Sequence, residues 1–381
     1  MRLLKDELYK ITSRRVVKIC FAAALLIELF CFLTGGVFLE YSVVDGVEYR
    51  GVAAIKQDRR MAKKYEGPLT DEKVKAIAAE YGLMHFDAET FNEESNFLNQ
   101  MLFSNGLCDG YIESWSDLQQ PAHTVPVAQT ELGSVCASAG VQPQLAYFRG
   151  WSILSVQLGI AGIMGCMLLM MALTPVFAEE YSTGTANILL STMHGRKKDI
   201  AARFGAALLF SLGSFVLLGA FIVALCGLFY GLDGSGCLYG MHGIWTPGSS
   251  GSMSVSLVTM GEYVLIQTAF IVVALLVLGA FSLFASAVCH TPFVALIVTV
   301  LFFVLPCGVW FYLALTDAPV NEVTQTIWHL ILCMPLYACM NGGVAEMIST
   351  EAIALRAVLS VVVCVPSLIL AWNLFRRHEA V

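Results

Sequence analysis

The stretch from Phe177 to Lys198 places carboxylates, a glycine and basic side chains close together. Two adjacent acids are followed by a Gly-Thr pair, a short apolar run and a basic turn. The residues of interest are Glu179, Glu180, Gly184, Thr185, Leu189, Leu190, Arg196, Lys197 and Lys198. This order predicts a glycine break, a short helix and a basic end that can pair with acidic groups or anionic lipid headgroups. A simpler interpretation is a solvated helix end followed by a basic topology anchor.

The rest of the sequence does not indicate a catalytic site. Four of the histidines are scattered, without a carboxylate or serine at catalytic spacing: His194, His242, His329 and His378. No CxxC pair suggests a metal site, and the run from Gly195 to Lys198 lacks the glycine spacing and final Ser or Thr of a phosphate loop. We therefore expect no catalytic residue, no metal ligand and no cofactor in this chain, which should not be an enzyme.

The composition places most of the chain in a membrane. The 381 residues are 57% hydrophobic and 13% charged, against roughly 25% charged residues in a soluble domain. No Lys or Arg occurs between Arg203 and Arg356. Such a gap excludes a soluble enzyme, a nucleic-acid binder and a disordered tail, because each needs solvated charge along its length. The expected partner along this length is the lipid bilayer.

Six segments are apolar enough over about 20 residues to cross the hydrocarbon core as helices. They are Val16–Leu39, Ile153–Phe177, Phe204–Leu228, Tyr263–Val288, Phe293–Leu315 and Ala354–Leu374. Lys and Arg in short loops mark the cytoplasmic side. They lie before the first segment, between the second and third, and after the sixth. The sequence therefore predicts a multi-pass protein of the plasma membrane with both termini in the cytoplasm.

The long segment Glu40–Gly150 should form a small α+β domain on the other side of the membrane. Asp45-Gly46 between two short β-prone runs predicts a hairpin. Thr70 predicts the start of a helix that ends at Gly82, and a second helix is predicted over Ala88–Ser104, followed by a loop-rich stretch.

Three further residues carry hypotheses. Cys108 and Cys136 both lie in the external domain and could form a disulfide if that side is oxidising. Glu28 lies near the middle of the first span, where an ionised carboxylate costs at least ~2.5 kcal/mol. It could line a substrate path or a dimer interface, or it could be a protonated packing residue.

The loop between the second and third spans resembles that of permease subunits of ABC-2-type ATP-binding-cassette transporters. The resemblance rests on an acid, Gly-Thr, Leu-Leu-Ser-Thr and a following Arg, found here at Glu180, Gly184-Thr185, 189–192 and Arg196. Met193 stands where the family often has Pro, and Arg203 stands where it often has Lys.

The resemblance implies an all-α permease with added elements. These are an amphipathic N-terminal helix over Leu3–Val17, a re-entrant outer hairpin at 326–340, a coupling loop at 178–203 and an external domain at 40–150, with 1–39 and 151–381 forming the membrane part. It also implies a separate ATPase subunit that binds ATP and Mg²⁺, a second permease chain in a homodimer or heterodimer, and export of a substrate.

Other classes remain open on the residues alone. A membrane receptor or accessory protein would bind a ligand in the outer domain and signal through the loop. An intramembrane enzyme would need paired catalytic groups at matching depth, and an ion-coupled carrier would need more intramembrane charge than Glu28 and a repeat symmetry that is not visible.

Overall fold

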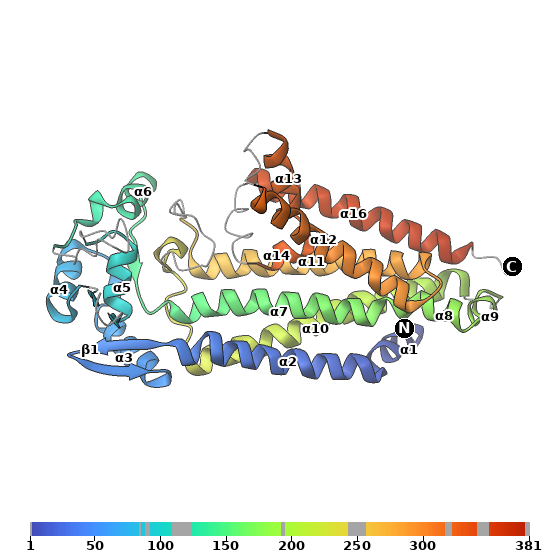
Figure 1. Ribbon diagram of the computed structural model, residues 1–381, viewed down its shortest axis with the longest axis horizontal. Helices are drawn as coiled ribbons and strands as arrows, with labels where there is room; N and C mark the ends of the chain where they lie inside the picture. Colours follow the sequence, from blue (N-terminus) through green and yellow to red (C-terminus); the bar gives the residue numbers. More distant parts are fainter. Residues whose placement is uncertain are drawn as a thin grey trace. The chain divides into compact units, whose positions relative to one another are not determined.

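A computed structural model of the chain is mostly helical (Figure 1). It describes residues 2–83, 85–87, 92–108, 123–191, 195–242, 257–316, 322–340 and 350–377. The chain divides into two compact units. Unit 1 comprises Met1–Glu28, Val156–Ile222 and Ile266–Val381, and unit 2 comprises Leu29–Ser155 and Val223–Leu265.

In the part of the chain that the structure describes, six helices are long and apolar enough to span a bilayer, which agrees with the number of spans predicted from sequence. They are α2 (Arg15–Gly35), α7 (Arg149–Leu173), α10 (Ile200–Phe229), α11 (Met260–Val288), α12 (Pro292–Leu315) and α16 (Thr350–Arg376). In each of them an 18-residue window contains at most two charged residues. Their composition suits a solvent of hydrocarbon, where a helix satisfies its own backbone hydrogen bonds.

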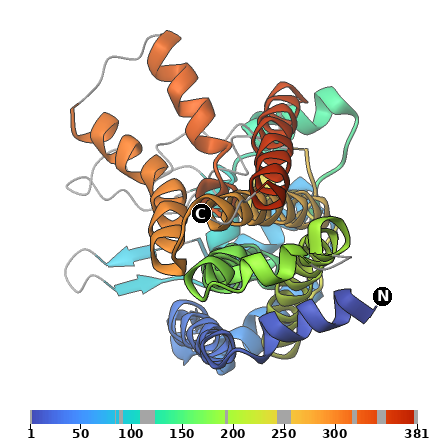
Figure 2. The ribbon, with the colours of Figure 1, turned by 90° about the vertical axis from the view of Figure 1, so that its right-hand side faces the viewer.

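The predicted N-terminal helix is present as α1 (Arg2–Ser13) and ends before Val17. Ile11 and Glu7 are its buried residues. The Leu4 side chain packs against Gly205 of α10, since a Cβ built on that glycine would lie 2.9 Å from it. Arg14 separates α1 from α2, and Figure 2 shows α1 running across the end of α2. The amphipathic pattern thus produces a separate helix that packs on α10 in unit 1.

The described residues between α12 and α16 include two short helices, α13 (Glu322–Leu332) and α14 (Pro335–Cys339). They are interrupted at Cys333 and Met334, directly before Pro335. The carbonyl oxygen of Cys339 lies 2.5 Å from the position of a Cβ built on Gly159, so α14 packs directly on the backbone of α7. Re-entry into the membrane remains a prediction for this pair.

Unit 2 contains the predicted hairpin, formed by β1 (Tyr41–Val44) and β2 (Val47–Arg50) in antiparallel register. Asp45 and Gly46 both have positive φ, at 53° and 72°. A two-residue turn with positive φ at both positions matches the twist of the flanking strands, which is why an Asp-Gly pair favours it.

Helices and short strand pairs complete unit 2. The remaining elements are α3 (Val52–Lys64), α4 (Asp71–Tyr81), α5 (Phe97–Ser104), α6 (Glu131–Ala139), β3 (Gly67–Pro68), β4 (His85–Asp87), β5 (Asn92–Glu94) and β6 (Gln144–Leu145), with 3₁₀ turns at Val37–Leu39, Val127–Gln129 and Tyr239–His242. Helix α4 begins at the Thr70 cap and ends at Gly82, as predicted.

The predicted helix over Ala88–Ser104 is too long. Residues 88–91 lie outside the described residues, Asn92–Glu94 form a strand, and the helix begins only at Phe97. Asn96 accepts hydrogen bonds from the backbone N–H groups of Leu98 and Asn99, and the Asn99 side-chain oxygen accepts one from the Asn96 N–H. This capping box fixes the start of the helix more strongly than the apolar spacing that suggested an earlier one.

Candidate functional site

The second span is interrupted at Thr174, and a short helix, α8 (Pro175–Ser182), follows it. Pro175 occupies the first turn of α8, where a missing N–H costs nothing. The backbone N–H groups of Phe177 and Ala178 both donate to the hydroxyl of Ser286 on α11, at 2.9 and 3.1 Å. Ser286 therefore caps α8 from another helix and fixes where the loop begins.

Arg203, near the start of α10, is the centre of a buried ion-pair cluster. Its side chain is 1% exposed, and its Nε lies 2.8 Å from Asp199 and 3.8 Å from Glu7. Its Nη2 lies 3.0 Å from Glu180, and its Nη1 donates to the carbonyl oxygen of Val176. Every guanidinium nitrogen thus faces an oxygen, as a buried charge requires. We call Arg203, Glu7, Glu180 and Asp199 the Arg203 cluster.

Two aromatic rings complete the surroundings of this guanidinium. Its carbon lies 5.5 Å from the ring centre of Phe177 on α8 and 5.4 Å from that of Phe375 on α16. The two rings also pack on each other, with centres 4.6 Å apart. A cation over an aromatic face is attracted by the ring quadrupole, most strongly where water is excluded. One side chain therefore joins α1, α8, α10 and α16.

The two adjacent carboxylates of the motif have different partners. Glu180 binds Arg203 in the interior, whereas Glu179 is half exposed and forms an ion pair with Arg14 at 2.5 Å. Arg14 also donates to the carbonyl oxygen of Ala172 at 3.1 Å. The acidic pair thus connects the loop both to the cluster and to the junction between α1 and α2.

Gly184 and Thr185 form the turn between α8 and α9 (Ala186–Ser191). Gly184 has a φ of +72°, a conformation that costs a residue with a Cβ. The Thr185 hydroxyl donates to the Glu180 carboxylate and lies 2.9 Å from the Thr183 hydroxyl. The Gly-Thr pair therefore turns the chain so that the start of α9 is tied to the Arg203 cluster.

The other motif residues are spread over α9 and the π-helix η3 (Gly195–Asp199). Leu190 is buried, Leu189 is half-buried, and Lys197 and Lys198 are exposed. Arg196 lies in η3, and Thr192, Met193 and His194 lie outside the described residues. The structure thus brings the acidic and Gly-Thr parts of the motif to one cluster and leaves the lysines on the surface.

Sequence reasoning missed three residues of the site. Asp199 stands four residues before Arg203, a spacing at which opposite charges pair on a helix. Glu7 interrupts the apolar face of Leu4 and Ile11, and an acid on such a face is a signal for a buried partner. Phe375 is far away in sequence and gives no local signal.

Glu28 on α2 is fully buried, at 0% exposure. Neither of its carboxylate oxygens has a hydrogen-bond partner among the described residues. Four residues earlier, Ala24 packs with Ala161 and Leu218 in a close three-helix contact. Glu28 therefore faces the interior of its own chain.

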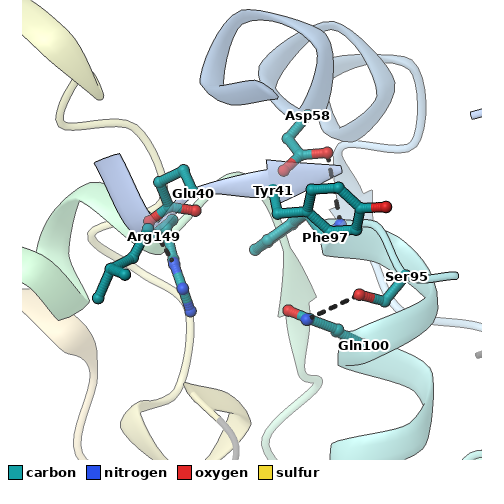
Figure 3. A pocket seen from close by; sticks show the side chains of 8 residues that line it. Glu40, Tyr41, Asp58, Ser95, Phe97, Gln100 and Arg149 are labelled. Carbon is teal, nitrogen blue, oxygen red and sulfur yellow. Dashed lines mark hydrogen bonds and ion pairs between the residues drawn. The ribbon is translucent and has the colours of Figure 1, made fainter. Parts of the chain in front are cut away.

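Unit 2 has a polar cavity of about 130 Å³ (Figure 3). The residues that line it are Leu39, Glu40, Tyr41, Asp58, Ser95, Phe97, Gln100 and Arg149. Glu40 pairs with Arg149 at 3.0 Å and accepts a hydrogen bond from Tyr230 at 3.2 Å. Asp58 accepts hydrogen bonds from the Ser42 hydroxyl at 2.7 Å and the Phe97 N–H at 3.4 Å.

Asp58 should make the stability of the protein depend on pH. Burial raises the pKa of Asp58 to about 7, and the charge of Glu40 adds to the rise, while the hydrogen bonds from Ser42 and Phe97 and the charge of Arg149 oppose it. Between about pH 4 and 7 the folded protein holds a proton that the unfolded chain has released, so the free energy of unfolding falls as the pH rises.

We expect wild type to lose about 2 kcal/mol more than Asp58→Asn between pH 5.5 and 8. The amide keeps the acceptor oxygen for Ser42 and Phe97 and removes the ionisation. Thermal unfolding of the full chain across this pH range measures the difference. Parallel pH profiles for wild type and Asp58→Asn would contradict the assignment.

Cys108 and Cys136 lie in different parts of unit 2. Cys108 is half-buried and forms an isolated β-bridge with Thr124, whereas Cys136 is buried in α6. Burial raises the pKa of the Cys136 thiol. Their disulfide stays a prediction. Among the described residues no group of three or more His, Cys, Asp and Glu could hold a metal ion.

A family model described as "ABC-2 family transporter protein" matches residues 1–380. No curated protein and no solved structure matches the chain. The match covers the six spanning helices, the loop with the Arg203 cluster and unit 2 alike. The chain therefore belongs to the ABC-2 family of transporter proteins.

Proposed function

We propose that this protein is the membrane-spanning permease subunit of an ABC exporter driven by a separate ATPase. The observation that supports this proposal is the Arg203 cluster, which connects the 178–203 loop to α1, α10 and α16. The permease would work beside a second permease chain, and ATP and Mg²⁺ would bind in the ATPase. Both termini and the 178–203 loop would face the cytoplasm, because the exposed Lys197 and Lys198 lie there.

The 178–203 loop is proposed as the coupling element. It has an exposed surface at Glu179, Ile188 and the two lysines, while Glu180 and Leu190 hold its inner side. A partner that pushes on this surface would move α8, and Arg203 would pass that movement to the helices it joins. Such a mechanism works only if the contacts of the loop differ between the two states of the transporter.

Glu28 is proposed to lie on the substrate path rather than at a permease interface. Its carboxylate is fully buried within its own chain, which favours an internal role. An intramembrane acid that lacks a partner marks a functional position by default.

Co-purification tests the proposal. Tagged full-length chain should retain an ABC ATPase in mild detergent, and variants Gly184→Val and Glu180→Gln should lower ATP-dependent transport. The proposal fails if no ATPase is retained, or if both variants transport at the wild-type rate.

Gly184→Val is expected to weaken the ATPase interaction while Gly184→Asn largely preserves it. The positive φ costs a residue with a Cβ about 1–2 kcal/mol, and this cost is highest for a β-branched residue, whereas Asn tolerates the conformation. No atom of the described residues lies within 4 Å of a Cβ built there, so the backbone conformation should decide the effect. A loss of up to about tenfold in affinity is expected, measured by titrating ATPase onto reconstituted permease. Equal affinity for the Val and Asn variants would contradict it.

A membrane receptor is the second candidate function, and the cavity of unit 2 is the observation that favours it. A receptor would respond to substitutions at Asp58 and Glu40 but would move no substrate in vesicles. Substrate flux from reconstituted permease and ATPase would exclude this candidate.

A further inference from the structure

Arg356 is a buried cation inside a candidate membrane-spanning segment. It lies in α16, within the apolar stretch Ile353–Arg376, and is 3% exposed. An arginine in such a segment is costly unless it is paired or reaches water. Arg203, which is also buried, is by contrast surrounded by carboxylates.

The surroundings of Arg356 satisfy only part of its guanidinium. Nη2 donates to the carbonyl oxygen of Leu332, at the end of α13. The guanidinium carbon lies 4.1 Å from the ring centre of Phe270 on α11. Nε and Nη1 have no hydrogen-bond partner among the described residues. Among the described residues, the titratable groups that act on it are the thiols of Cys333, which also hydrogen-bonds to the guanidinium, and Cys339, and neither is a carboxylate.

These contacts leave a positive charge and two donors without an acceptor. A buried guanidinium with unmade hydrogen bonds is unfavourable, so this position calls for a group that supplies both negative charge and acceptor oxygens. Carboxylates and phosphates do so, and arginine prefers them as partners. Water could fill the acceptor role but not the charge.

We propose that Arg356 is part of a binding site for an oxyanion, a carboxylate or phosphate group, at the break between α13 and α14. Phe270 forms one wall and the Leu332 carbonyl orients the guanidinium. The oxyanion belongs either to a free ligand or to an anionic lipid headgroup. If it is a free ligand, it is the acidic group of the transported substrate, and this identification rests on the proposed function.

Binding is tested on the full-length chain in a maltoside detergent, which contains no phosphate. The thermal unfolding temperature is followed during titration with inorganic phosphate at constant ionic strength, and separately with phosphatidylglycerol. Wild type should be stabilised in one arm, with an apparent affinity about tenfold or more above that of Arg356→Gln. Arg356→Lys, which keeps the charge and loses the planar donors, should lie between them. Arg377→Gln, at an exposed arginine directly after the same segment, is the matched control and should behave as wild type.

The two arms identify the source of the oxyanion. Stabilisation by inorganic phosphate indicates a free ligand, and stabilisation by phosphatidylglycerol alone indicates a lipid headgroup. The proposal is overturned if wild type and Arg356→Gln respond equally in both arms. It is also overturned if wild type responds in neither arm but the Glu346→Gln or Glu351→Gln variant does respond. A carboxylate of the same chain is then the partner of the guanidinium. No ATPase is present in this experiment, so its failure is separate from that of the co-purification test.

Discussion

Arg203→Gln is expected to be the most damaging single substitution in unit 1. It removes the cation at the centre of the Arg203 cluster and leaves Glu180 and Asp199 without their arginine partner, whereas Glu7 keeps its pair with Lys10. Removing one partner of a buried ion pair costs about 3–5 kcal/mol, because the remaining charge stays desolvated. Thermal unfolding in nanodiscs and ATP-dependent transport both measure the loss.

Matched variants separate the charge from the packing. Arg203→Lys keeps the charge and should recover part of the stability. The double variant Arg203→Gln/Glu180→Gln should be more stable than Arg203→Gln alone, because it has one buried carboxylate fewer. Glu179→Gln breaks the half-exposed pair with Arg14, which should cost about 0–1 kcal/mol. If Arg203→Gln is no more destabilising than Glu179→Gln, the cluster does not hold these helices together.

Gly159→Ala is expected to separate α14 from α7. A Cβ at this position would lie 2.5 Å from the carbonyl oxygen of Cys339, a backbone atom that cannot turn aside as a side chain can. Overpacking of this kind costs about 1–3 kcal/mol. Thermal unfolding of the full chain gives the cost, and the accessibility of the Cys339 thiol to a maleimide reports the separation.

Gly165→Ala on the same helix is the control. Its Cβ would meet Leu275 at 3.5 Å, an ordinary contact. Alanine favours a helix over glycine by about 0.5–1 kcal/mol, so this variant should be neutral or more stable. Equal effects of Gly159→Ala and Gly165→Ala would mean that helix propensity, and not the approach of α14, explains the glycine.

The features predicted from sequence were those with a local physical cause. Spans follow from runs of apolar residues, the hairpin from Asp45-Gly46, and the start of α4 from Thr70. The predicted start of α5 was wrong, because the Asn96 capping box outweighed an apolar spacing that continues towards the N-terminus.

The candidate site was predicted only in part for a related reason. The loop motif identified Glu180, Gly184 and Thr185, but not what they contact. Glu7 and Phe375 reach Arg203 from segments far away in sequence, and no spacing rule relates such positions. Asp199 alone was within reach of a helical pairing rule.

The composition of the Arg203 cluster has a consequence for the synthesis of the chain. Glu7, Glu180, Asp199 and Arg203 have all been made when α10 emerges from the ribosome, so the ionic contacts can form early. The ring of Phe375 is added only after α11 and α12 have been made. A nascent chain, or one truncated before α16, therefore lacks one of the two aromatic rings that lie beside the Arg203 guanidinium.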